Sequence, residues 1–495
     1  MQGGKRYNAG RKSIPFEEKK NGYKIYLTRQ QKNYIDNYGN GKSFSEKCVN
    51  LLFNSIFDDK QDTVKFIDLF AGLGGIRIGF TQGFEELGIK TKCVFSSEIK
   101  KYAVEAYKNY FGDKNISGDI TKIPAEAIPD FDFLLAGFPC QPFSSAGKGL
   151  GFLDTRGTLF FEIERILKNK IEEGHPAQGF LLENVEVLIN HDDGKTLNTI
   201  ISHLEKLGYT VNYNLLDSRY FGLAQSRKRV YIVGMLNSKI SLDNFEKSTS
   251  KLNDILEHGL PTINSEFTKR LFENFSTEEI IGKSIKDKRG GENNIHSWDI
   301  ELKGHTTEQE RLLLNAILKE RRKKHWAEEI GIKWMDGMPL TYKQIRTFFD
   351  VPNLKKMLND LTKKGYLTLE HPKQQVNGIR VFDESKPKGY NIVSGKLSFE
   401  FTKILNPNEL APTLVAMDVS RLGVVDGNGL RKLTIREGQR LCGYPENYDL
   451  SFLKENEAFD LLGNTVCLPV IKAISKRIGK EYRRLTNETN SSRNI

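Results

Sequence analysis

The sequence predicts an α/β protein built on an open sheet, and three short apolar runs indicate this fold. They are residues 64–70, 131–136 and 179–182, and each opens into a polar or glycine-containing turn that leads toward a helical stretch. Such runs are typical of strands buried on both faces. Because ligands bind beyond the carboxyl ends of the strands in open α/β sheets, we expect the turns after these strands to hold the functional residues.

The chain is long enough for several domains and carries excess positive charge. Its 495 residues predict two to four domains. The net charge of +11 favours a polyanionic partner, although a basic surface can also serve solubility alone. Five scattered cysteines without a CxxC pair indicate neither a metal site nor a disulfide framework and fit a reducing cytoplasm. The apolar runs are too short to span a membrane.

Residues 1–60 form a basic N-terminal extension. Its first 20 residues are nearly devoid of apolar side chains and are expected to be unstructured. Residues 23–28 alternate as a short strand, and helical stretches follow at 29–38 and 43–57. This order is similar to a ribbon-helix-helix DNA-binding module, which would make the protein a dimer, and a simple helical cap on the next domain fits the same residues.

A glycine-rich turn and two acids follow the first strands. Residues 71–75, Ala-Gly-Leu-Gly-Gly, lead from the first strand into a helix, and glycines there let a ligand approach the backbone closely. Their spacing departs from the GxGxxG of dinucleotide-binding folds. Glu98 stands where an acid is placed to bind ribose hydroxyls, and a solvated helix N-cap fits the same position. Asp119 follows the next βα unit, where a carboxylate would accept a hydrogen bond from an adenine amino group.

Candidate chemistry lies after the next two strands. Cys140 is on a proline-bracketed loop, where a thiol acts as a nucleophile once its pKa is lowered, and the alternative is a small buried hydrophobe. Glu183 ends the adjoining strand, where a buried carboxylate is costly unless it is paired or used. Arg227 and Arg229 alternate into a further strand, a pattern that an exposed basic edge would also give.

Pro139-Cys140-Gln141 resembles the catalytic loop of the DNA (cytosine-5)-methyltransferases. Further blocks occur in the order of that family over about residues 64–480, at 71–75, 183–185, 224–234, 433–445 and 462–470. The resemblance implies a Rossmann-like class I S-adenosylmethionine-dependent methyltransferase fold with a mixed seven-stranded sheet. It also implies a bacterial cytoplasmic enzyme of the restriction-modification type, acting as a monomer on a cytosine flipped out of duplex DNA and paired with a restriction endonuclease.

The resemblance also implies roles for individual residues. The catalytic residues would be Cys140, which adds to cytosine C6, Glu183, which binds N3 in its protonated form, and Arg227 and Arg229, which help to hold the base and phosphate. The S-adenosylmethionine contacts would be Phe70, Gly72, Leu73, Glu98, Ile99, Asp119, Pro139, Asn464 and Val466. The DNA contacts beside the cysteine and in the 224–234 block would be Gln141, Ser144 and Gln225.

The remaining sequence predicts how the domains are divided. Residues 61–234 form the catalytic and cofactor-binding domain, 235–400 a target-recognition domain, 401–482 a return segment, and 483–495 a disordered tail. In the insertion we expect a helix at 308–329, whose basic run either contacts phosphate or is a solvated face. Helices at 341–349 and 353–364 and strands at 366–369 and 378–382 look like a winged helix. Its DNA-facing side would carry Lys355, Lys356, Lys363 and Lys364.

Two other functions fit parts of the pattern. A tRNA cytosine-5 methyltransferase would share the fold, but its substrate offers loops that are already unstacked and would not need so large a basic insertion. A DNA-binding transcriptional regulator would act through the N-terminal module, alone or in addition to methylation.

Overall fold

The computed structural model describes residues 27–28, 32, 35–36, 42–49, 63–113, 116–139, 158–288, 290–291, 293–376, 379–393, 399–416 and 418–493. The chain divides into two compact units, Met1–Asp62 and Thr63–Ile495. In the first unit, the Ser43 hydroxyl accepts the N–H of Glu46 at 3.2 Å, as expected of a residue that caps the helix beginning there. Most of the predicted strand at 23–28, on which the ribbon-helix-helix comparison depends, lies outside the described residues.

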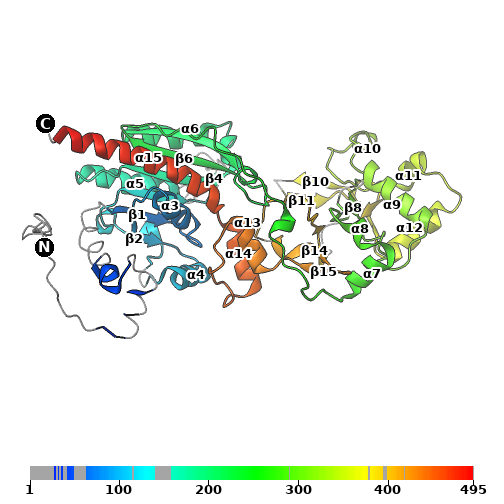
Figure 1. Ribbon diagram of the computed structural model, residues 1–495. Coiled ribbons are helices and arrows are strands. Elements are labelled where there is room, and N and C mark those ends of the chain that lie inside the picture. The colour runs from blue at the N-terminus through cyan, green and yellow to red at the C-terminus, as the bar shows by residue number, and fades with distance from the viewer. Residues whose placement is uncertain are drawn as a thin grey trace, which may run out of the picture. The chain divides into compact units, whose positions relative to one another are not determined.

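The second unit contains a mixed sheet of six strands (Figure 1). Its order is β2-β1-β3-β4-β6-β5, in which β1 to β4 are parallel and β6 is antiparallel to both of its neighbours. The strands are β1 (Val64–Leu69), β2 (Thr91–Ser97), β3 (Phe133–Gly137), β4 (Gly179–Val185), β5 (Tyr209–Asp217) and β6 (Lys228–Leu236). The α/β fold expected from the sequence is therefore confirmed.

The seventh strand is reduced to one bridge. Among the described residues, Ser117 pairs in parallel with Ser97 at the β2 edge, and no further ladder follows. Asp119 then accepts the N–H of Thr121 and caps a 3-10 turn, Ile120–Lys122, which takes the chain away from the sheet. The prediction of seven strands is corrected to six strands and a bridge for this reason.

Helices cover both faces of the sheet and make three layers. Alternate strand residues point to opposite faces, so that Phe66 and Leu135 join one core and Ile67 and Leu134 join the other. The first face carries α3 (Gly75–Glu85) and α15 (Leu468–Arg493), and the second carries α5 (Thr158–Glu172) and α6 (Lys195–Lys206). The α3 and α15 backbones approach closely because α3 has a glycine at the contact, where a Cβ on Gly79 would lie 2.6 Å from Cβ of Ile471.

Helix α15 continues to Arg493, so the tail predicted to be disordered from residue 483 is helical as far as the structure describes it. Arg484 supports this extension through ion pairs with Glu481 and Glu488 at 2.7 and 2.6 Å, which are helix neighbours. The segment Glu455–Glu488 meets the length and hydropathy expected of a membrane span, yet 67% of its apolar window is buried inside the protein. That burial is the pattern of a core helix.

The insertion after β6 contains a second sheet, in the order β15-β14-β13-β7-β8. Its strands are β7 (Ser284–Ile285), β8 (Asn294–Ile295), β13 (Lys403–Ile404), β14 (Leu422–Asp426) and β15 (Gly429–Lys432), and the helices α7 (Glu266–Asn274) and α8 (Thr277–Ile280) precede it. Beyond this sheet the chain returns to the six-stranded sheet through α13 (Ile435–Cys442) and α14 (Glu455–Asn464). Residues of α4 (Lys101–Phe111) share one hydrophobic core with these two helices.

A winged helix is nested in this insertion, between β8 and β13. Its elements are α9 (Glu308–Glu320), α10 (His325–Glu329), α11 (Tyr342–Phe348), α12 (Leu354–Lys363), β9 (Leu367–Glu370), β10 (Lys373–Val376), β11 (Ile379–Phe382) and β12 (Gly389–Ile392). Strands β9 and β12 pair, Leu340 bridges to Tyr390 as a third short strand, and the β10–β11 hairpin between them forms the wing. Leu313, Leu358 and their neighbours give it a core of its own.

The predicted helix at 308–329 is broken in the structure. Helix α9 ends at Glu320, and α10 begins at His325, so the basic run lies at the break. Arg321 at this break is 4% exposed, and its Nη1 donates to Asn391 Oδ1 at 2.6 Å. This arginine therefore joins α9 to β12.

Candidate active site

Parallel strands bring most of the predicted site residues to one edge of the central sheet. In the register of β3 and β4, Gly137 lies opposite Glu183, so that the chain leading to Cys140 starts beside that carboxylate. Strand β6 runs the other way and begins at the same edge, where Arg229 lies opposite Val185. Cys140, Gln141 and Ser144 themselves lie outside the described residues.

Glu183 and Arg229 form a buried ion pair at this edge. Arg229 Nε lies 3.0 Å from Glu183 Oε1, and the two side chains are 14% and 12% exposed. Burial raises the pKa of Glu183, and the neighbouring Arg229 and Arg227 act in the opposite direction. The other oxygen, Oε2, would lie 3.6 Å from a Cβ on Gly137, so the glycine leaves space beside it. The site thus holds a carboxyl group whose proton is retained to a higher pH than usual.

Asn184 holds the start of the cysteine loop. Its Nδ2 donates to the carbonyl oxygen of Phe138 at 3.0 Å, and its Oδ1 accepts the N–H of Val185 at 2.8 Å. The Asn184 side chain is 2% exposed, so this contact is shielded from water. One strand end therefore carries the carboxyl group and also fixes the backbone two residues before Cys140. The sequence analysis gave Asn184 no role, although a polar residue directly after a buried strand was a usable signal.

Arg227 and Gln225 bind the return segment. The Arg227 guanidinium donates to the carbonyl oxygens of Leu414 and Gly463 at 2.9 and 3.1 Å. Gln225 is fully buried, with its amide donating to the carbonyl of Leu441 and accepting the N–H of Leu414, each at 2.9 Å. The prediction that Gln225 contacts DNA is wrong, because both ends of its amide are used inside the protein. Arg227 is 2% exposed, and its positive charge near Glu183 lowers the pKa of that carboxyl group.

The glycine turn after β1 is open to a ligand. Phe70 and Gly72 have φ values of +55° and +53°, a left-handed conformation that is costly for phenylalanine and is found mostly at functional sites. A Cβ on Gly72 would meet nothing within 4 Å. On the other side, the Tyr448 hydroxyl donates to the Leu73 carbonyl at 2.8 Å, and Val466 packs against Gly75. The return segment therefore supports the turn from behind, and Tyr448 was missed by the sequence analysis.

Glu98 joins this turn to the end of β2. Its Oε2 accepts the N–H of Gly72 at 2.8 Å, and its Oε1 accepts those of Ile99 and Lys100 at 2.9 and 2.8 Å. The next side chain, Ile99, is 73% exposed, which is unusual for isoleucine. A fixed carboxylate beside an exposed apolar side chain and an open glycine turn has the chemistry to bind the hydroxyls and the flat base of a nucleoside.

Asp119 is half-buried and Asn464 is exposed. Asp119 Oδ1 accepts the N–H and the hydroxyl of Thr121, which leaves Oδ2 with only a distant contact to Lys122 at 3.7 Å. Asn464 Nδ2 donates to the backbone carbonyl and to Oδ1 of Asp460. Contacts of these two side chains with a cofactor stay predictions.

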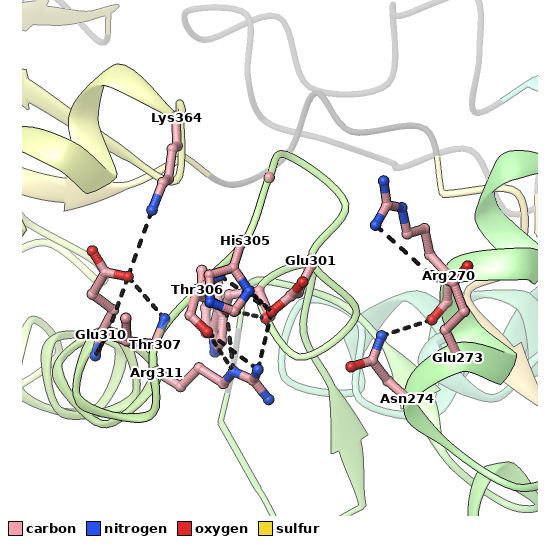
Figure 2. A network of polar contacts seen from close by, with 12 residues as sticks. Arg270, Glu273, Asn274, Glu301, His305, Thr306, Thr307, Glu310, Arg311 and Lys364 are labelled. Atoms are coloured by element: carbon pink, nitrogen blue, oxygen red, sulfur yellow. Dashed lines mark hydrogen bonds and ion pairs between the residues drawn. The ribbon is translucent and has the colours of Figure 1, made fainter.

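The predicted DNA-facing lysines of α12 differ in their environment. Lys355 and Lys356 are exposed and make no ion pair among the described residues. Lys364 instead reaches to the buried Glu310 at 3.6 Å (Figure 2). It also forms an ion pair with Asp360. In the same figure Glu301 binds Arg311 at 3.1 Å, which fixes the turn before α9. Lys364 is therefore a structural residue that joins α12 to α9, and its assignment to the DNA-facing side is corrected.

Comparisons with known proteins agree on one family. A family model described as C-5 cytosine-specific DNA methylase matches residues 64–480. The type II methyltransferase M.NlaIV of Neisseria lactamica is 58% identical over 423 residues, which cover 84% of this chain and 98% of that protein. M.NgoBV of Neisseria gonorrhoeae is 57% identical with the same coverage. M.HgiCI of Herpetosiphon aurantiacus is 43% identical over 437 residues, 83% of this chain and 96% of that protein.

Proposed function

Because the chain belongs to the C-5 cytosine-specific DNA methylase family and its homologues are type II methyltransferases, we propose that it methylates C5 of a cytosine in a specific short sequence of duplex DNA. Such an enzyme would act in a bacterial cytoplasm and protect DNA from a cognate restriction endonuclease. Residues 61–234 and 401–482 would form its catalytic part, and 235–400 would recognise the target.

S-adenosylmethionine is the cofactor that this family of methyltransferases implies, and it would supply the electrophilic methyl group. The residues of the sheet edge fit it. The open turn at Gly72 admits a ligand close to the backbone, Glu98 offers a carboxylate held by three N–H groups, and Ile99 offers an apolar surface. Phe70, Leu73, Asp119, Pro139, Asn464 and Val466 would complete the site.

The chemistry assigned to Cys140 and Glu183 follows from the electronic structure of cytosine. C5 is a weak nucleophile, and addition of the Cys140 thiolate to C6 makes it enamine-like. The C5–C6 electrons must move toward N3 during this addition, so a protonated Glu183 that donates to N3 lowers the barrier. Loss of the C5 proton after methylation re-forms the double bond, and the C6–sulfur bond breaks to release Cys140 as a thiolate.

The buried Glu183 beside Gly137 is the observation that carries this assignment. A carboxyl group with a raised pKa keeps its proton to a higher pH than an ordinary glutamate does, and the same strand end fixes the cysteine loop through Asn184. Arg229, paired with Glu183, keeps the carboxyl group in place and adds positive charge at the site. A guanidinium close to Cys140 would also favour its thiolate.

Bisulfite sequencing of DNA from cells that express the chain tests this function. The wild type should leave one cytosine of a short recurring sequence unconverted, and Cys140→Ser should leave none. Cys48→Ser, which changes a cysteine of the N-terminal unit, is the matched control and should methylate as the wild type does. Methylation of tRNA with unmodified DNA would favour the tRNA enzyme, and retained methylation by Cys140→Ser would contradict the assigned nucleophile.

A further inference from the structure

Two adjoining cavities on the insertion are lined by cationic side chains without acidic partners. One cavity of about 540 Å³ lies between the wing and the β9–β12 pair and is lined in part by Lys288, Lys373 and Arg380. The other, of about 320 Å³, is lined in part by Lys286, Lys288 and Arg421. Lys288 belongs to both. We call the two cavities together the wing groove.

The acids of the wing groove are already satisfied. Asp287 accepts the N–H and the hydroxyl of Ser297 at 2.8 and 2.7 Å. Asp336 pairs with Arg322 at 2.8 Å, and Glu370 accepts the amide of Asn391 at 2.7 Å. In contrast, none of the five cations that line the groove at the surface forms an ion pair among the described residues. They are Lys286, Lys288, Lys373, Arg380 and Arg421.

The register of the wing directs its cations toward the groove. Gln375 pairs with Arg380, and Lys373 pairs with Phe382, so that these four side chains share one face of the β10–β11 ribbon. Lys373 and Arg380 are exposed and line the cavity. The buried Arg321 also lines it, and its Nε has no hydrogen-bond partner although the residue is only 4% exposed. The groove is therefore a built cationic surface with unused donors.

We propose that the wing groove holds the phosphate backbone of the substrate duplex, with Lys373 and Arg380 of the wing and Lys288 of the second sheet as phosphate contacts. The proposal rests on the proposed function, because duplex DNA is the polyanion on which this family acts. Charge complementarity selects the occupant, since a phosphate backbone offers a row of anionic acceptors to unpaired lysine and arginine side chains. An acidic protein segment is the other occupant that the test must exclude.

The nested position of the winged helix makes this surface separable from catalysis. The winged helix lies between β8 and β13, outside the central sheet, and has a hydrophobic core of its own. A change in exposed wing residues should therefore raise the KM for DNA more than it lowers kcat. Phosphate contacts also carry no base information, so the preference for the methylated sequence over a scrambled duplex should stay the same.

The test compares full-length variants by titrating a fluorescent duplex that contains the methylated sequence, and a scrambled duplex, between 50 and 300 mM salt. For K373Q/R380Q, loss of two phosphate contacts should reduce the slope of log K against log salt by about 1.8 and weaken both affinities by up to about 60-fold at 0.1 M salt. K373R/R380K keeps both charges and should keep the slope. The matched control is K92Q/K206Q, which removes two exposed lysines of the catalytic unit, and its slope should be that of the wild type.

Unchanged slope and affinity in K373Q/R380Q would overturn the proposal and would leave an acidic protein segment as the occupant to examine. A lower kcat with an unchanged KM for DNA, or a loss of sequence preference alone, would also overturn it. Wild-type methylation of the same duplex is measured in parallel, because failure of that reaction counts against the proposed function and leaves the slope comparison valid.

Discussion

Replacing Arg229 with methionine should make the stability of the protein strongly dependent on pH. The substitution leaves the Glu183 carboxylate in a site where its side chain is 12% exposed and its partner at 3.0 Å has been removed. Breaking a buried ion pair by removal of one partner costs about 3–5 kcal/mol, and the remaining charge of Arg227 nearby places the expected loss near 3 kcal/mol at pH 8.

The loss should shrink on acidification because Glu183 takes up a proton. Burial already raises the pKa of this group above its ordinary value of 4.5, so the folded state binds the proton more tightly than the unfolded state. This tighter binding of the proton stabilises the folded state below pH 4.5, and the stabilisation is lost as the pH rises through the raised pKa of Glu183. Without Arg229 that pKa rises further, and we expect the R229M loss to be only about 1 kcal/mol at pH 5, the cost of an unsatisfied neutral group.

Urea denaturation followed by circular dichroism at pH 5 and pH 8 measures this difference. The double variant E183Q/R229M is the control, since it removes the carboxylate together with its partner and should show a small loss that does not depend on pH. The reasoning is refuted if R229M loses the same stability at both pH values, or if the double variant is as unstable as R229M at pH 8.

Three further predictions address the cofactor turn, the return segment and α12. Glu98→Gln should weaken S-adenosylmethionine binding by about 10–100-fold in calorimetry, because a charge-assisted acceptor is lost; an unchanged Kd would contradict the assigned site. Gln225→Ala should cost about 3 kcal/mol in urea denaturation, from two buried groups left unpaired, with DNA affinity unchanged where the protein is folded. K355Q/K356Q should lower the salt slope of DNA binding by about 1.8 if both lysines contact phosphates; a slope equal to that of K92Q/K206Q would remove α12 from the DNA-binding surface.

The sequence predicted those features whose cause is local. Glu183 and the turn at 71–75 follow directly from apolar strands, because parallel strands must end at a common edge. The winged helix was also predictable from the order of its elements, but the pairing of β9 with β12 across the inserted wing was not. The strand expected at 378–382 is β11, the second strand of the wing. It pairs with β10, its neighbour in the chain, and β9 pairs with β12 instead.

The contacts that were not predicted join residues that are remote in the chain. Arg227 binds carbonyl oxygens 187 and 236 residues further along, and Gln225 binds a backbone N–H 189 residues away. A basic or polar side chain at the start of a strand can bind either a ligand or the backbone of a remote segment. Sequence spacing could not distinguish between these two roles. Lys364 was misassigned in the same way, because Glu310 lies on another helix of the winged helix.

These remote contacts explain how the insertion can be large without disturbing the sheet. The chain leaves the sheet at the end of β6, at Leu236, and the backbone that returns is bound by Gln225 and Arg227 next to the start of the same strand. The two ends of the insertion are thus anchored to the catalytic unit, while Tyr448 of the returning chain supports the glycine turn. Arg227 accordingly binds the returning segment and adds positive charge near Glu183. Its loss should weaken cofactor binding and methylation together, whereas loss of Arg229 should affect methylation more than cofactor binding.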